Sequence, residues 1–97
     1  MRKVSVSDSV WDRLDLLSDY LTDEYKLSEH AAILRIDRLL NFLFSLGYPA
    51  DYALCRFKRW RALGYHCAVF ENWVFAYEIF DDGIIIRDMS NAASLFE

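Results

Sequence analysis

The sequence has few cysteines and no long hydrophobic run. Its two cysteines, Cys55 and Cys67, are too few for a disulfide framework, and they lack the paired CxxC or HxxxH spacing of a zinc site. We therefore expect two buried reduced thiols, and no spacing indicates a metal or cofactor. No stretch approaches the length of a membrane span, and no apolar run of the kind found in signal peptides follows Val4. These absences predict a cytoplasmic protein.

Basic residues are also scarce outside one short stretch. The net charge is −4, and residues 1–54 carry 6 basic and 9 acidic groups, whereas residues 63–97 carry 1 and 6. Residues 55–62 carry 4 basic groups and no acidic one. Proteins that bind nucleic acid through its phosphates usually have a basic surface, because each Lys or Arg contact releases a counterion. Any such binding here is confined to Arg56, Lys58, Arg59 and Arg61.

Hydrophobic and aromatic residues, by contrast, are abundant. They make up 55% and 16% of the chain, which excludes a disordered tail. A length of 97 residues is enough to bury one modest core but not a second. We therefore predict a single domain over residues 1–97.

The N-terminal part is expected to contain a strand and a helix. Lys3–Val6 alternates polar and apolar residues, as a short strand does. Ser7, Asp8 and Ser9 then offer N-cap side chains. Apolar residues follow at helical spacing, namely Val10, Leu14, Leu17 and Leu21. We predict a first helix from about Ser9 to Tyr25.

A second amphipathic helix follows Ser28, which is another N-cap candidate. Its apolar stripe consists of Ile33, Ile36, Leu40 and Leu43, widened by Leu39 and Leu46. Gly47, in the left-handed conformation, and Pro49 are expected to end it. The few residues between the two helices predict an antiparallel helical hairpin.

The last third of the chain has the pattern of a three-stranded antiparallel meander. Three apolar segments run from Gly64 to Met89, separated by turns at Asn72 and at Asp82-Gly83. Asp-Gly tolerates the positive φ of a tight hairpin turn. We expect the helical hairpin to pack on a small antiparallel sheet in an α+β fold of order β-α-α-β-β-β.

Residues 50–63 allow two interpretations. In the first, a helical turn or two anchors the apolar residues in the core while the cations face water. In the second, Trp60 or Phe57 stacks on a nucleic-acid base and the arginines hold phosphate. We favour the first, because charge interleaved with aromatic residues on a short amphipathic turn is ordinary packing. Its anchors would be Tyr52, Leu54, Phe57, Trp60 and Leu63.

Most aromatic rings are expected in the core. This applies to Trp11, Phe42, Phe75 and Tyr77. His30 is expected on the surface of the second helix.

The order of elements resembles the RelE/ParE superfamily of toxins from bacterial type II toxin–antitoxin pairs, which includes plasmid stabilization proteins. The resemblance is sharpest over Trp73–Ile86, which is similar to the family's central hairpin and has Tyr77 at its recurrent tyrosine. It implies a growth-inhibiting protein neutralised by a cognate antitoxin. Antitoxins of this family add a strand to the toxin or fill an apolar groove on it.

RelE-like members are ribosome-dependent mRNA endoribonucleases. They use arginine and lysine to hold the scissile phosphate, and many use a tyrosine or histidine near the C-terminus to assist proton transfer. The resemblance places Val74 and Ala92 at arginine positions and Phe96 at the tyrosine position. The basic positions of the first meander strand hold Tyr65 and Cys67. A nuclease would therefore need a non-standard residue set.

ParE-like members are closer, because they poison DNA gyrase without a catalytic set. Their familiar ending is loosely matched by Asp88–Ser94. The sequence leaves three hypotheses: a toxin that acts by binding a target, a nuclease that uses the basic residues of Arg56–Arg61 with His66, and a non-toxic interaction module. A homodimer is possible under each of them. His66 itself is expected on the solvent face of its strand. The target-binding candidates are Arg56, Lys58, Arg59, Arg61, Trp60, His66 and Arg87, and no catalytic residue is assigned.

Overall fold

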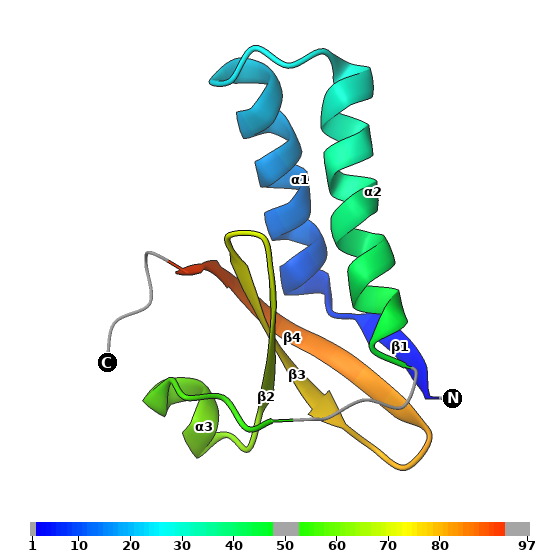
Figure 1. Ribbon diagram of the computed structural model, residues 1–97, viewed down its shortest axis with the longest axis vertical. Coiled ribbons are helices and arrows are strands. Elements are labelled where there is room, and N and C mark those ends of the chain that lie inside the picture. The colour runs from blue at the N-terminus through cyan, green and yellow to red at the C-terminus, as the bar shows by residue number, and fades with distance from the viewer. Residues whose placement is uncertain (1, 48–52, 93–97) are drawn as a thin grey trace.

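A computed structural model describes residues 2–47 and 53–92 and confirms the predicted α+β fold (Figure 1). Two helices form a hairpin that packs on one face of a four-stranded sheet and projects beyond its end. A third, short helix lies on the other face. In chain order the elements are β1 (Lys3–Val6), α1 (Asp8–Asp23), α2 (Glu29–Ser45), α3 (Lys58–Ala62), β2 (His66–Phe70), β3 (Trp73–Ile79) and β4 (Gly83–Asn91).

The sheet has strand order β1-β4-β3-β2 and is mixed, so the prediction of an antiparallel sheet is wrong for β1. Strands β2, β3 and β4 form the predicted antiparallel meander. Strand β1 adds to the far side of β4 in parallel, with Val4 opposite Ile84. The parallel pairing is possible because two helices and the meander separate the strands, which gives the chain the long crossover that parallel neighbours require.

Each face of the sheet buries its own core, because side chains alternate along β3. Phe75 and Tyr77 are buried against the helical hairpin, where α1 contributes Val10 and Leu14 and α2 contributes Leu39 and Leu43. Val74 and Ala76 face the other way and are buried against Trp60. The second core is small and holds α3 on the sheet.

The helix starts follow the sequence pattern in part. Ser28 caps α2, since its Oγ accepts a hydrogen bond from Ala31 N at 3.1 Å. Ser7 precedes α1 but makes no side-chain cap. Its Oγ instead donates to the carbonyl of Arg87 at 3.4 Å, which ties the start of α1 to β4.

Positive backbone φ angles do not occur where the sequence predicted them. Neither Gly47 nor Gly83 has a positive φ. The predictions of a left-handed residue at the end of α2 and of a positive φ at Asp82-Gly83 are therefore both wrong. The turn between β2 and β3 uses positive φ at Glu71 instead, and Gly64 has φ of 78°. Pro49 lies outside the described residues.

Gly47 is required for a close approach of two backbones. Its carbonyl accepts a hydrogen bond from Arg2 N at 2.9 Å, at the start of β1. A Cβ atom on Gly47 would lie 2.2 Å from the Arg2 carbonyl oxygen. Because this neighbour is backbone, no rotamer change could relieve the clash.

We therefore expect Gly47→Ala to lower the free energy of unfolding by about 1–3 kcal/mol, measured by urea denaturation followed by circular dichroism. Gly83→Ala is the matched control, because its Cβ would lie 3.3 Å from the Lys3 carbonyl oxygen and needs only a small adjustment. Equal losses in the two variants would contradict the proposed clash at Gly47.

The two cysteines form a disulfide, so the prediction of two reduced thiols is wrong. Cys55 precedes α3 and Cys67 lies in β2, 12 residues later. Residues 53–55 run beside the start of β2, with Cys55 N donating to Tyr65 O at 3.0 Å and Cys67 N donating to Ala53 O at 3.2 Å. This short backbone pairing places the two sulfur atoms together, and residue spacing alone does not reveal it.

The core prediction holds for Phe42, Phe75 and Tyr77 and fails for Trp11. Phe75 and Tyr77 are buried as predicted, and Phe42 is half-buried and stacks on Phe70 with 4.8 Å between ring centroids. Trp11 is 39% exposed, so its assignment to the core is wrong. His30 is exposed, as predicted. Within residues 2–47 and 53–92, every helix is too short or too polar to cross a membrane.

Candidate functional site

Two adjoining hollows lie between α1 and the end of the sheet that carries the β2–β3 turn. Their volumes are about 350 and 420 Å³. They share Leu17, Tyr20, Trp73 and Asn91, so they form one continuous groove. We call it the α1 groove.

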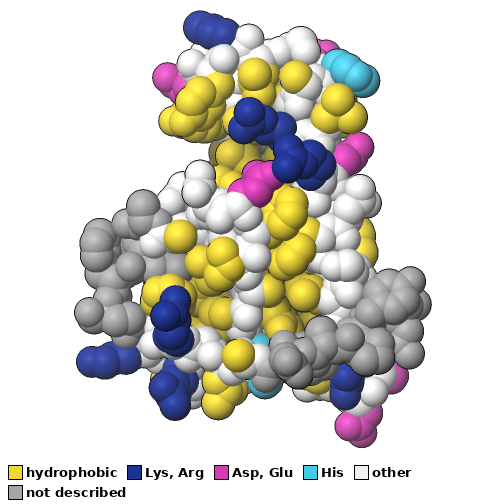
Figure 2. Space-filling view, in the orientation of Figure 1, with side chains coloured by type: hydrophobic (Ala, Val, Ile, Leu, Met, Phe, Trp, Pro, Cys, Tyr) yellow, Lys and Arg dark blue, Asp and Glu magenta, His cyan; other side chains and the backbone are white. Residues whose placement is uncertain are grey.

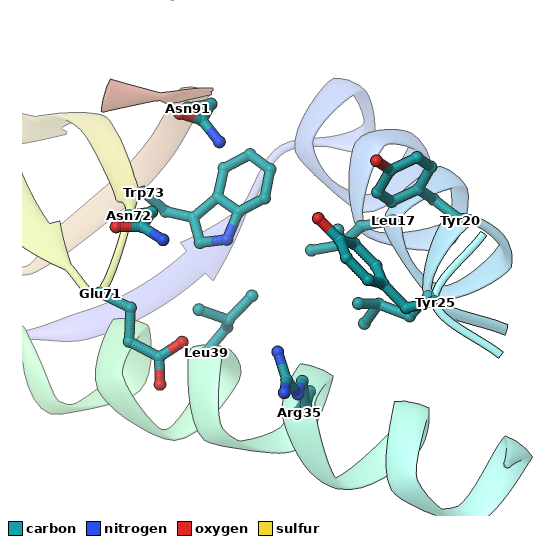
Figure 3. Close-up of a pocket in the computed structure, with 10 residues that line it drawn as sticks. Leu17, Tyr20, Tyr25, Arg35, Leu39, Glu71, Asn72, Trp73 and Asn91 are labelled. Atoms are coloured by element: carbon teal, nitrogen blue, oxygen red, sulfur yellow. The ribbon is translucent and has the colours of Figure 1, made fainter. Parts of the chain in front are cut away.

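The α1 groove has one wall from the helices and one from the sheet. Figure 3 shows the Trp73 ring of β3 on one side, with Tyr20 and Tyr25 on the other. Leu39 of α2 contributes to the floor of the first hollow. Leu16 of α1 lines the second hollow and is 67% exposed. The apolar lining is therefore accessible from solvent.

The tyrosine wall is a paired arrangement. The rings of Tyr20 and Tyr25 meet edge to face, with centroids 5.2 Å apart. A side-chain hydrogen bond with Tyr25 raises the pKa of Tyr20, and the charge of a second phenolate would act in the same direction. Both effects favour the neutral phenol of Tyr20.

Polar groups lie around the rim of the groove. Arg38 of α2 pairs with Glu71 of the β2–β3 turn at 2.5 Å, which links the helical hairpin to the sheet. Arg35, one turn earlier on α2, lines the groove and makes no ion pair with another described residue. Asn72 and Asn91 add two side-chain amides. The groove thus combines an apolar floor with one available cation.

The basic residues predicted to bind a target gather on a second surface. Arg56, Lys58, Arg59 and Arg61 are exposed on and beside α3. All four lie between Cys55 and Cys67, within the loop that the disulfide closes. We call residues 55–67 the basic loop. Figure 2 shows Lys and Arg side chains grouped where α3 lies in Figure 1.

Trp60 is an anchor of the basic loop and not a stacking platform. Its side chain is 1% exposed, and its Nε1 donates to the Asp88 carboxylate at 3.1 Å. Phe57 packs beside it, with ring centroids 5.9 Å apart. Trp60 therefore cannot stack on a nucleic-acid base, which corrects its place among the target-binding candidates.

The anchoring interpretation is wrong for the two leucines. Leu54 is 51% exposed and Leu63 is 60% exposed, so neither reaches the core. They instead flank the cations of the basic loop on the surface. Tyr52 lies outside the described residues.

The remaining two candidates are paired with residues of the sheet. His66 sits opposite Tyr77 in the sheet and stacks on its ring at 5.8 Å, on the face covered by the helical hairpin. Its predicted place on the solvent face is therefore wrong. Arg87 pairs with Glu78 across β3 and β4 at 2.6 Å. The sheet thus separates His66 from α3, and the nuclease centre built from both is not assembled.

The positions that the family resemblance assigned to ribonuclease chemistry carry no charge here. Val74 is buried in the core under α3, and Cys67 is in the disulfide. Tyr65 is half-buried and Ala92 is exposed. Phe96 lies outside the described residues. In the described part of the chain, no group of three or more His, Cys, Asp or Glu side chains could hold a metal ion.

No family model, curated protein or solved structure matches this chain. The α1 groove and the basic loop are therefore the two surfaces from which a function can be inferred.

Sequence reasoning located the basic loop but missed the α1 groove. The groove residues come from α1, α2, the β2–β3 turn, β3 and β4. Their proximity depends on how the helical hairpin is placed over the sheet. Leu16 and Tyr20 lie outside the apolar stripe of α1 in the sequence pattern, and both are exposed in the structure. Apolar residues outside the stripe were therefore the sequence signal for a partner-binding face.

Proposed function

We propose that this protein is the toxin-like component of a type II toxin–antitoxin pair, and that it acts by binding a cellular target in the cytoplasm. The α1 groove carries the proposal. A solvent-open groove lined by tryptophan, tyrosine and leucine suits a protein partner, because interface cores are enriched in aromatic residues and depleted of charge. Apart from the added helix α3, the observed elements follow the predicted order β-α-α-β-β-β, on which the resemblance was based.

The occupant proposed for the groove is an apolar segment of the cognate antitoxin. Leu16, Leu17 and Trp73 supply the contact surface. Arg35 would pair with an acidic residue of the segment. A groove already formed in the free protein lowers the ordering cost of binding.

The residue chemistry favours binding over catalysis. Cleavage of RNA requires groups that stabilise charge on the scissile phosphate and move a proton from the 2′-oxygen. Val74 is buried and uncharged at the position where the resemblance calls for an arginine. A target bound without chemistry, such as DNA gyrase, needs none of these groups.

The decisive experiment induces the protein alone in a bacterium and pulse-labels DNA and protein synthesis side by side. Early loss of DNA synthesis is expected for a toxin that binds a gyrase-type target. If translation stops first, a ribosome-dependent ribonuclease is the better assignment. Unaffected growth would contradict toxicity and leave a non-toxic interaction module.

The groove itself is tested by Leu16→Glu. We expect this variant to keep its growth inhibition but to bind the product of the adjacent reading frame about 100-fold more weakly, because an unpaired carboxylate would enter an apolar contact. Affinity is measured by calorimetry and neutralisation by co-expression. Ile33→Glu is the matched control, because Ile33 is a similarly exposed apolar residue on α2 that does not line the groove. Equal loss in both variants would contradict a groove-bound partner.

A further inference from the structure

Helix α1 carries a continuous stripe of negative charge. Its aspartates recur every three or four residues, so they share one face of the helix. All are exposed, and none makes an ion pair with another described residue. They are Asp8, Asp12, Asp15, Asp19 and Asp23, and we call them the acidic stripe.

The acidic stripe opposes the stability of its own helix. Neighbouring like charges at these spacings repel and destabilise a helix. The helix dipole favours Asp8 in the first turn but disfavours Asp23 at the other end, where no basic residue occurs in the last turn. The acidic stripe therefore lowers the stability of α1, and no cation in the described part of the chain pairs with it to offset the repulsion. Such an uncompensated feature indicates a binding partner.

The basic loop is the matching feature of opposite sign. Arg56, Lys58 and Arg61 are exposed and make no ion pair with a described residue, whereas Arg59 lies 3.9 Å from Asp88. The disulfide and the buried Trp60 side chain hold the loop on the sheet. The three cations are therefore presented in a fixed arrangement, which reduces the ordering cost of a contact.

The acidic stripe and the basic loop belong to elements that pack on different faces of the sheet. The helical hairpin packs on the face of the sheet that carries Phe75 and Tyr77. Trp60 and the basic loop pack on the opposite face, against Val74 and Ala76. Arg13 of α1 and Arg59 of the basic loop both contact the Asp88 carboxylate, but no aspartate of the acidic stripe pairs with a cation of the loop in the same molecule. A second molecule can supply those pairs.

We propose that the basic loop of one copy docks on the acidic stripe of α1 in a second copy of this chain. The contact matches charge with opposite charge. It also matches apolar surface, because Leu54 and Leu63 flank the cations while Trp11 flanks the stripe, and all three are exposed. A single partner then accounts for both unpaired charge clusters.

A nucleic acid fits the basic loop less well. Base stacking requires an exposed aromatic ring, and Trp60 is buried. The exposed leucines would have no role against a phosphate backbone. The remainder of the chain is acidic and would repel a long polyanion, since the net charge is −4 despite the loop.

The test begins with sedimentation velocity of the full chain over a range of protein and salt concentrations. We expect concentration-dependent association at low salt and about tenfold weaker association at high salt, because exposed charge pairs are screened. A protein that stays monomeric at every concentration in low salt would overturn the proposal.

Charge reversal then tests which surfaces meet. Arg56→Glu/Lys58→Glu/Arg61→Glu and Asp12→Lys/Asp15→Lys/Asp19→Lys should each weaken self-association about 100-fold, because like charges would face each other. Mixing the two variants should restore association, since the reversed loop of one now matches the reversed stripe of the other. Failure of the mixture to associate would overturn the proposal.

Net charge and folding are controlled separately. Glu29→Lys/Asp37→Lys/Asp81→Lys changes the total charge as much as the stripe variant does, at exposed positions outside both surfaces. It should associate like the unaltered chain. Circular dichroism and urea denaturation of every variant confirm that the substitutions leave the fold intact. Weakened association of this control would assign the effect to net charge and overturn the specific contact.

Discussion

Trp60→Ala should lower the free energy of unfolding by about 3–5 kcal/mol, the range found when a large buried aromatic ring is removed. Trp60 is the largest fully buried side chain of the described residues, and it fills the small core between α3 and the sheet. Few neighbours surround that core, so little can move into the space. The measurement is urea denaturation followed by circular dichroism.

Trp60→Phe separates packing from hydrogen bonding. It keeps an aromatic ring in the core but removes the Nε1 donor to Asp88. Asp88 keeps Arg13 at 3.2 Å and accepts from Met89 N at 2.8 Å, so its carboxylate retains partners. We expect a loss of about 1–2 kcal/mol. If Trp60→Ala and Trp60→Phe lower the free energy of unfolding by the same amount, the stabilisation comes from the hydrogen bond and not from the volume that the ring fills.

The sequence predicted the elements of this fold because each has a local period. Leu14 and Leu21 recur at helical spacing and are buried on α1. Phe75 and Tyr77 alternate with Val74 and Ala76, and both sets are buried because each face of the sheet is covered at β3. Periodicity reports which positions share a face, but not what covers that face.

The features missed from the sequence depend on contacts between distant segments. Gly47 faces Arg2 across the chain, and no local pattern indicates that approach. The α1 groove likewise exists only once Trp73 of β3 lies beside Tyr20 of α1. The basic loop could be located because its charges are adjacent in sequence, whereas the burial of Trp60 required the fold.

The redox state of Cys55 and Cys67 depends on the compartment in which the protein acts. Structural disulfides are rare in cytosolic proteins, where thiols are kept reduced. A cytoplasmic toxin would therefore function with Cys55 and Cys67 as thiols for at least part of its life. The basic loop would then be held by Trp60 and by the backbone pairing of residues 53–55 with the start of β2.

Cys55→Ser/Cys67→Ser should lower the free energy of unfolding by about 3 kcal/mol relative to the oxidised protein. Closing a loop of this length restricts the unfolded chain by roughly that amount, and 12 residues separate the two cysteines. Urea denaturation of both proteins, with and without dithiothreitol, measures the difference. The reductant converts the disulfide to two thiols and is itself oxidised, so it should destabilise the native chain and leave the double variant unchanged.

The same pair of proteins tests whether the bond matters in the cell. Alkylation of free thiols at the moment of lysis, followed by mass spectrometry, reports the fraction of molecules in which Cys55 and Cys67 are bonded. A fully reduced protein that still inhibits growth would show that inhibition does not require the disulfide. Loss of inhibition in the double variant, with the fold intact by circular dichroism, would instead show that the covalent link is necessary for function.

The denaturation experiment tests the disulfide itself. Equal stability of the native protein and the double variant in the absence of reductant would contradict the bond.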